Sequence, residues 1–150
     1  MKDKINHYRR NLVRVHLIRE DSRSSPQISN PEEAVKVIGE AIASYDREVL
    51  VCAHLDSRNR VLSIEEVSKG TLSSAPVNAR ELFTGAILSK SSSIILYHNH
   101  PSGDELPSTD DERATSIVKQ AGQLLGIPLL DHLIITSSGK HYSFKEQKKL

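Results

Sequence analysis

Two histidines separated by one residue follow a short apolar run, and a Pro-Ser-Gly loop comes after them. The run is Ile94–Tyr97, the histidines are His98 and His100, and the loop begins at Pro101. Side chains at positions i and i+2 of an extended segment point to the same side. Both imidazoles can therefore aim at one point just past the end of the predicted strand.

A helix-start signal carrying an acid follows the loop. Seven residues separate His100 from Ser108, which is enough chain to turn back, and Asp111 lies one turn into the predicted helix. Two imidazoles and a carboxylate that converge in this way make a three-ligand zinc site with an open fourth position. Ser-x-x-Asp is also a capping box, which needs no metal. The two interpretations are compatible, because a capping Ser108 would hold Asp111 in place.

Each of these side chains also has an interpretation that needs no metal. A lone His-x-His is common and would indicate only a polar turn; the strand before it and the acid at a helix start favour a metal site. Asp110 competes with its neighbour for the ligand role but points elsewhere on the helix. Asp104 and Glu105 lie in the loop, and we expect both to be solvated.

A catalytic zinc also needs a base near its water, whose pKa falls to about 7 on the ion. Glu48 opens an otherwise buried strand, so its carboxylate is a candidate, although spacing alone does not decide its role. Glu65 and Glu66 in the next strand are better explained as solvent-facing. His132 is predicted to be a structural histidine paired with a neighbour rather than a fourth ligand. Cys52 is predicted to be a core residue.

The composition is that of an ordinary globular domain. The chain has 150 residues, 26% charged and 37% hydrophobic, with a net charge of +1, so bulk charge gives no argument for nucleic acid or a membrane surface. One cysteine excludes an intrachain disulfide and suits a reducing compartment. The N-terminus has no apolar segment and no run is long enough to span a membrane, so we expect a cytoplasmic protein.

The rest of the chain predicts strands alternating with helices. The strands are expected at Leu12–Ile18, Glu48–Leu55, Val61–Val67, Ile94–Tyr97, Leu129–Thr136 and His141–Phe144. Helices are expected from Pro31 to about Tyr45, from Pro76 to Lys90 and from Ser108 to Leu125. Their predicted inward faces include Ala34, Val35, Ile38, Ala41, Ile42 and Tyr45; Leu82, Phe83, Ala86 and Ile87; Ala114, Ile117, Val118, Ala121, Leu124 and Leu125. This alternation favours an α/β fold with a mixed sheet flanked by helices.

The candidate residues resemble a known motif. His98-x-His100-x7-Ser108-x2-Asp111 with Glu48 upstream is similar to the JAMM (MPN+) metalloprotease motif at every motif position. The longer strings His98-Asn-His-Pro-Ser-Gly, Pro107-Ser108, Leu125-Gly-Ile and Asp131-His132-Leu-Ile resemble the RadC-like branch of that superfamily. The resemblance runs from about residue 28 to residue 144.

This resemblance implies a zinc ion held by His98, His100 and Asp111, with water as the fourth ligand. It implies Glu48 as general base and proton donor, and Ser108 as the group that stabilises the oxyanion. The implied reaction is hydrolysis of a peptide or isopeptide amide in a protein or peptide substrate. The implied architecture is the JAB/MPN, cytidine-deaminase-like three-layer fold over residues 28–150. Residues 1–27 are expected to form an N-terminal strand and loop extension.

The sequence differs from the family pattern in two features, and both bear on the alternative functions. The expected form is short and lacks the helix-hairpin-helix segment of long RadC proteins, which weakens the link to DNA repair. The segments after Val67 and after Phe144 are too short for the insertions with which JAMM deubiquitinases hold ubiquitin. The first alternative is a DNA-repair-associated accessory module that binds DNA or protein with a non-catalytic metal site; a metal-dependent nuclease is the second.

Two further metal-enzyme classes are disfavoured by the residues. The adjacent His-Asn-His tripeptide differs from the residues of HNH nucleases, which are spread over a ββα unit. A zinc deaminase needs a Pro-Cys-x-x-Cys signature, and a chain with one cysteine cannot form it.

Overall fold

A five-stranded mixed sheet forms the middle layer of the molecule. The computed structural model describes residues 25–70 and 77–150. The strand order across the sheet is β2-β1-β3-β4-β5. The strands are β1 Val49–Leu55, β2 Val61–Lys69, β3 Ser93–His100, β4 Leu129–Thr136 and β5 His141–Ser143. β1 runs antiparallel to both β2 and β3, β3 runs parallel to β4, and β4 runs antiparallel to β5.

Two fully buried strands lie next to each other within this sheet. Every residue of β1 and of β3 is buried, as expected for strands covered on both faces. β2 alternates between partly buried and exposed residues because it forms an edge. β1 and β2 are joined by the predicted turn, in which Asn59 adopts a left-handed conformation with φ of 57°.

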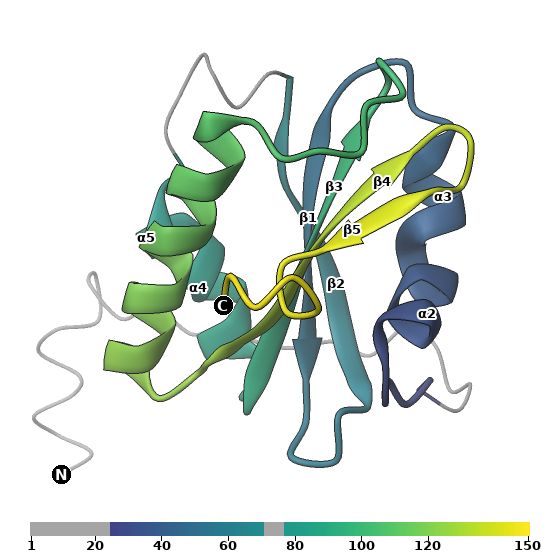
Figure 1. Cartoon of the computed structure of the whole chain (residues 1–150). Coiled ribbons are helices and arrows are strands. Elements are labelled where there is room, and N and C mark those ends of the chain that lie inside the picture. Colours follow the sequence, from purple (N-terminus) through teal and green to yellow (C-terminus); the bar gives the residue numbers. More distant parts are fainter. Residues whose placement is uncertain (1–24, 71–76) are drawn as a thin grey trace, which may run out of the picture.

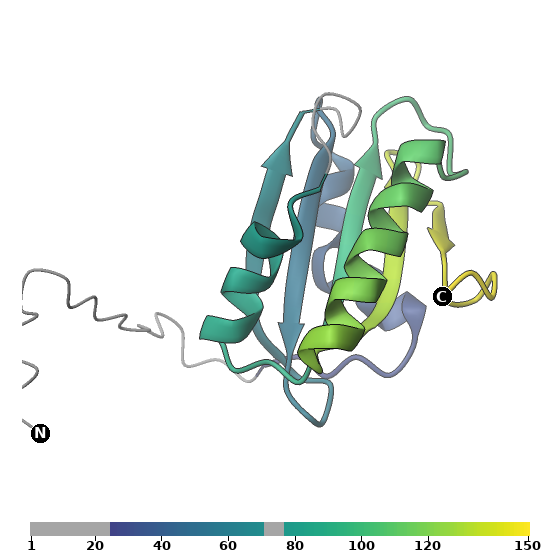
Figure 2. The same cartoon turned by 90° about the vertical axis from the view of Figure 1, so that its left-hand side faces the viewer.

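Helices cover both faces of the sheet (Figures 1 and 2). One face carries a continuous helical segment made of α2 Pro31–Ala34, the π-helical turn η2 Val35–Gly39 and α3 Glu40–Ala43. The other face carries α4 Ala79–Leu88 and α5 Thr109–Leu125. These three layers place a hydrophobic core on each side of the sheet.

Each core takes alternate residues of the central strands. The core under α2 and α3 contains Ile28, Ala34, Ile38, Ile42, Val49, Val51, Ala53, Leu55, Val61, Ile95, Tyr97, Leu133 and Ile135. The core under α4 and α5 contains Cys52, Leu82, Phe83, Ala86, Ile94, Leu96, Val118, Ile127 and Leu129. The alternation leaves His98 and His100 on the α5 side, because they continue the series that begins with Ile94 and Leu96.

The predicted fold class is confirmed: the chain is an α/β protein with a mixed sheet and flanking helices. The hairpin, the helix that ends at Leu125 and the bounds of β4 agree with the prediction, and Gly126 ends α5 in the left-handed conformation, with φ of 70°. The first helical segment ends at Ala43 rather than Tyr45, and α4 spans Ala79–Leu88 rather than Pro76 to Lys90, Pro76 itself being outside the described residues. The predicted strand Leu12–Ile18 lies outside the described residues. The division of the chain into residues 1–27 and 28–150 stays a prediction.

Some predicted inward positions are wrong. Ile87, Leu124 and Leu125 are exposed, with Leu124 88% accessible, and each lies in the last turn of its helix. Ala41 and Tyr45, which the predicted inward face of the first helix also includes, are exposed too. The i→i+5 hydrogen bonding of η2 underwinds the first helical segment, and its buried face instead follows every fourth residue, namely Ala34, Ile38 and Ile42.

Within the described parts of the chain, residues 25–70 and 77–150, no helix is long and apolar enough to cross a membrane.

Candidate metal centre

The two histidines lie at the C-terminal end of β3. The sequence prediction placed them just past the strand end, but β3 continues through His100, because Asn99 and His100 still pair with Ile135 and Thr136 of β4. Both imidazoles lie on the same side of the sheet, with ring centroids 4.9 Å apart and planes at 89°. The strand therefore fixes their spacing more firmly than a loop would.

Backbone carbonyls orient both rings. The Nδ1 atom of His98 lies 3.0 Å from the carbonyl oxygen of Val49, and that of His100 lies 2.7 Å from the carbonyl oxygen of Asp104. A carbonyl only accepts, so each Nδ1 carries the proton and donates it. In the neutral form of each ring the lone pair therefore lies on Nε2, as is typical of metal-binding histidines.

Asp111 faces these two nitrogen atoms from the first turn of α5. Ser108 is the N-cap residue, and the predicted capping box is present. The Ser108 N–H and hydroxyl both donate to Asp111 Oδ2, each at 2.7 Å, and the Asp111 N–H donates to Ser108 Oγ at 3.1 Å. The same hydrogen bonds that begin the helix therefore hold the carboxylate toward the histidines.

The three side chains fit a metal ion. Asp111 Oδ1 lies 3.5 Å from His98 Nε2, and Asp111 Oδ2 lies 3.3 Å from His100 Nε2. Two ligand atoms on a tetrahedral zinc ion, each about 2.1 Å from the metal, are about 3.4 Å apart. One donor atom from each residue lies within 4.8 Å of the others, and all three residues are buried. His98, His100 and Asp111 can therefore hold a metal ion.

Burial and hydrogen bonding set the charge state of this group. Burial lowers the pKa of His98, whereas the hydrogen bond to Asp111 raises the pKa of His100. Burial alone would raise the pKa of Asp111, but hydrogen bonds from His100 and Ser108 outweigh it and hold that pKa well below its usual range. Asp111 is thus an anion at neutral pH, and a metal would compete with a proton at His100.

Glu48 lies beside this group, directly before β1. It is half-buried and lines the same cavity, of about 370 Å³, as the three candidate ligands. Its charge opposes the burial that lowers the pKa of His98, and it adds to the Asp111 hydrogen bond that raises the pKa of His100. The structure therefore brings Glu48 together with the residues that the sequence motif connects to it.

The other acids lie in less suitable places. Asp110 and Asp104 line the cavity, but neither belongs to the three-donor group found among the described residues. The Asp104 side chain is exposed as predicted, yet its backbone carbonyl orients His100. Glu66 is exposed as predicted. Glu65 is only partly solvent-facing: 42% of its side chain is accessible, and its Oε2 lies 3.7 Å from His54 Nε2.

Thr115 was not singled out by the sequence, although it lies one turn after Asp111. Its hydroxyl donates to the Asp111 carbonyl oxygen at 2.7 Å and lies 2.7 Å from His132 Nδ1. His132 is therefore paired with a neighbour, as predicted. Only the helical spacing of Asp111 and Thr115 could have indicated this contact in advance.

Fold and site together define an α/β domain with a His-x-His pair at the end of a central strand and an aspartate at the start of the following helix. A sequence model of the RadC-like JAB domain matches residues 28–150. The chain belongs to this family.

Curated relatives support the assignment. The chain is 42% identical over 121 residues to a UPF0758 protein of Clostridium perfringens, which covers 81% of this chain and 53% of the relative. It is 46% identical over 110 residues to a UPF0758 protein of Desulforudis audaxviator, and this match covers 73% of the chain and 48% of the relative. A UPF0758 protein of Shouchella clausii is 40% identical over 129 residues, covering 86% and 56%. The chain spans about half the length of these relatives.

Proposed function

We propose that this chain is a zinc-dependent hydrolase of the JAMM type, a metallopeptidase that cleaves an amide bond in a protein or peptide. The observation that carries the proposal is the buried His98, His100 and Asp111 group opening into a cavity that Glu48 also lines. A structural zinc is usually closed by four protein ligands, whereas three ligands beside a cavity leave room for water and substrate.

A zinc ion in this group would supply Lewis acidity, which lowers the pKa of water to about 7 and polarises the amide carbonyl. The chain's own residues do the remaining work. His98, His100 and Asp111 hold their donor atoms in place through the Val49, Asp104 and Ser108 contacts. Glu48 accepts a proton from the attacking water and returns it to the leaving amine.

Ser108 has a second role in this proposal, which needs a local rotation. Its hydroxyl donates to Asp111 Oδ2 at 2.7 Å. To stabilise an oxyanion, that hydroxyl must turn its proton from Asp111 toward the substrate. Asp111 would keep the backbone N–H of Ser108 as a donor during this change, so the start of the helix need not move.

The charge around the cavity favours an amide substrate over a nucleic acid. Glu48, Asp104, Asp110 and Asp111 all line the cavity, and so many carboxylates repel phosphate groups. This acidic lining counts against a nucleic acid as the substrate bound in this cavity. A substrate with neutral or cationic groups beside the scissile amide suits it better.

The test is cleavage of unfolded proteins by the zinc-loaded chain, with new N-termini identified by mass spectrometry. Glu48→Gln is the matched control, because it keeps the size of the side chain and all three candidate ligands. We expect the unmodified chain to generate new N-termini and Glu48→Gln to generate none at the same zinc occupancy. Equal cleavage by both, or no cleavage of any peptide or protein by the zinc-loaded chain, would contradict the proposal.

A further inference from the structure

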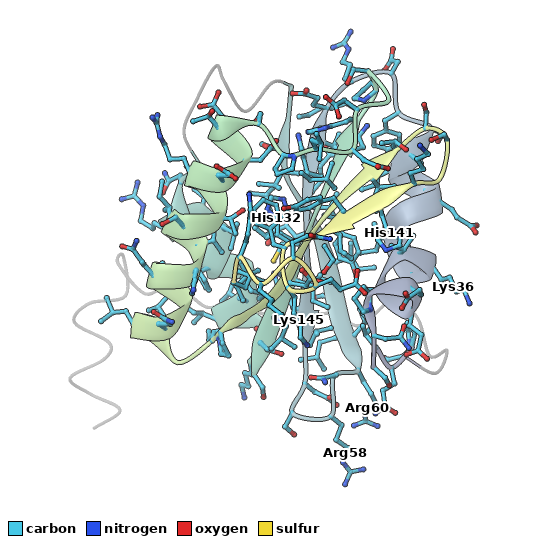
Figure 3. All side chains as sticks on the ribbon, in the orientation of Figure 1. Lys36, Arg58, Arg60, His132, His141 and Lys145 are labelled. Atoms are coloured by element: carbon cyan, nitrogen blue, oxygen red, sulfur yellow. The ribbon has the colours of Figure 1, made fainter. Side chains whose placement is uncertain are left out.

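His132, on β4, lies between the sheet and α5 (Figure 3), where it contacts Thr115. It pairs with Leu96 in the β3–β4 ladder, and Leu96 precedes His98 by two residues on the same face of the sheet. The imidazole is fully buried. It stacks on Phe144 with ring centroids 5.0 Å apart and planes at 7°, so its orientation is fixed.

The direction of one hydrogen bond follows from another. The Thr115 hydroxyl donates its single proton to the carbonyl oxygen of Asp111. It must therefore accept from His132, so Nδ1 carries the imidazole proton. A chain of two donors thus runs from His132 through Thr115 to the main chain of Asp111.

The remaining nitrogen of His132 shows that this ring is not present for packing alone. Its Nε2 is buried and has no hydrogen-bond partner among the described residues. Leaving a buried acceptor unpaired is unfavourable, and an apolar ring would fill the same space without that cost. The imidazole therefore provides a hydrogen-bond donor to Thr115 through Nδ1 although its buried Nε2 is left without a partner.

We propose that His132, acting through Thr115, is a positioning residue for the metal ligand Asp111. This inference rests on the metal site of the proposed function. Ser108 holds the Asp111 carboxylate, but Ser108 moves with α5, so the capping box cannot fix the helix relative to β3. The His132–Thr115 contact joins α5 to β4, the neighbour of the strand that carries His98 and His100. It thereby fixes the distance from the carboxylate to both imidazoles.

The protonation state of His132 suits this role. Burial lowers its pKa to about 3, so the ring is neutral at physiological pH. A neutral ring donates to Thr115 without adding a positive charge beside a cation site. Partners of metal ligands of this kind contribute about 10–100-fold to metal affinity.

The experiment measures zinc affinity by competition with a chromophoric chelator, together with the visible spectrum of the Co²⁺-loaded protein. His132→Phe keeps an aromatic ring against Phe144 but removes the donor, and Thr115→Val removes the hydroxyl. His132→Asn is the rescue variant, because its amide nitrogen can reach the place of Nδ1. Urea unfolding of the metal-free proteins measures the purely structural cost of each change.

His54 offers a matched control. It is also buried, its Nδ1 lies 2.8 Å from Ser63 Oγ, and its Nε2 is likewise without a partner among the described residues. It lies under α4 and has no hydrogen bond to Asp111 or Thr115. His54→Phe should lower stability and leave both the zinc affinity and the Co²⁺ spectrum unchanged.

We expect His132→Phe and Thr115→Val each to weaken zinc binding about 10–100-fold and to change the Co²⁺ spectrum. The double variant should lose no more zinc affinity than the single variant that binds zinc more weakly, because both changes break the same chain of hydrogen bonds. His132→Asn should stay within about threefold of the unmodified protein, as expected for a retained contact. The inference would be overturned by unchanged zinc binding in His132→Phe or Thr115→Val, or by additive losses in the double variant. A loss in His132→Asn or in His54→Phe as large as the loss in His132→Phe would also overturn it.

The readout separates this inference from the proposed function. A chain that binds zinc with the predicted pattern but cleaves no peptide would contradict the peptidase and leave the role of His132 standing. A chain that binds no zinc in any form would overturn both.

Discussion

Two backbone carbonyl oxygens determine which nitrogen each candidate histidine ligand presents. Val49 and Asp104 accept the Nδ1 protons of His98 and His100, so both Nε2 atoms face Asp111. The motif reveals the types and spacing of the ligands, but it cannot reveal these acceptors. Val49 is 49 positions from its histidine, and Asp104 contributes through its main chain rather than its side chain.

Ser108 provides a test at the residue scale. Ser108→Ala removes the hydroxyl that donates to Asp111 Oδ2 at 2.7 Å while the backbone N–H remains. We expect zinc affinity to fall about 10-fold or more and the free energy of unfolding to fall by about 1 kcal/mol through loss of the cap. Chelator competition and urea unfolding measure the two effects.

Ser108→Thr is the control, because threonine keeps the hydroxyl and also caps helices. It should retain most of the zinc affinity. An alanine variant with the affinity of the unmodified chain would show that the Ser108 hydroxyl plays no part in holding Asp111.

At the scale of the element, α5 carries Asp111 at its first turn and packs on the sheet through a close approach near its end. A Cβ atom at Gly122 would lie 2.5 Å from the carbonyl oxygen of Ile127 and 3.3 Å from Phe83 Cζ. The neighbour is backbone, so no side-chain rotation relieves the contact. Gly122 thus allows the helix to lie against the start of β4.

Gly122→Ala should destabilise the protein although alanine is the better helix former. In an exposed helix the change would stabilise by about 1 kcal/mol; here overpacking should cost about 1–3 kcal/mol. Urea unfolding checks the sign. Gln120→Ala, at an exposed position of the same helix, should change stability by less than about 0.5 kcal/mol. A stabilised Gly122→Ala protein would mean that α5 does not approach β4 closely.

The sequence predicts most elements correctly because their signals are local. Pro31, the Ser108 cap and Gly126 mark helix ends, and the apolar run of β1 marks a central strand. The errors depend on tertiary context. Helical spacing alone predicts an inward position for Leu124, but this side chain is 88% accessible in the last turn of α5. Nor could it find the π-helical turn at Val35–Gly39, which shifts the buried face of the first helical segment.

Part of the site was also predictable from the sequence. The grouping of His98, His100 and Asp111 follows from the alternation of a strand and the start of a helix. Glu48 lies directly before β1, and its place beside the group depends on the pairing of Leu50 with His98. Spacing along the chain carries no information about that pairing.

On the scale of the whole molecule, two buried neutral histidines make stability depend on pH. His54 and His132 lie under α4 and α5 on the same face of the sheet, and burial lowers the pKa of each, to about 4 and about 3. The unfolded chain binds protons at both positions more readily than the native chain. Stability is therefore fully present above the ordinary histidine pKa and is lost as the pH falls.

His54 allows this effect to be measured away from the metal centre. Between pH 6.5 and pH 4 the unfolded chain holds about one proton more at this residue than the native chain. The free energy of unfolding should therefore fall by about 1.4 kcal/mol per pH unit from this group alone. Glu65, whose Oε2 lies 3.7 Å from His54 Nε2, is unchanged in the variant His54→Asn.

His54→Asn should have a shallower dependence of stability on pH over this interval, although it is less stable at pH 7. Urea unfolding of both proteins with a chelator present gives the two slopes. Equal slopes would show that His54 already binds its proton in the native state.

The central claim is that His98, His100 and Asp111 bind zinc and leave a position open for catalysis. Its most direct test is the zinc content of the purified chain, measured beside His100→Ala, Asp111→Ala and Glu48→Gln. We predict one zinc ion per chain in the unmodified protein and in Glu48→Gln, and almost none in the two alanine variants. An unmodified protein that holds no zinc after supplementation, or alanine variants that retain it, would contradict the claim.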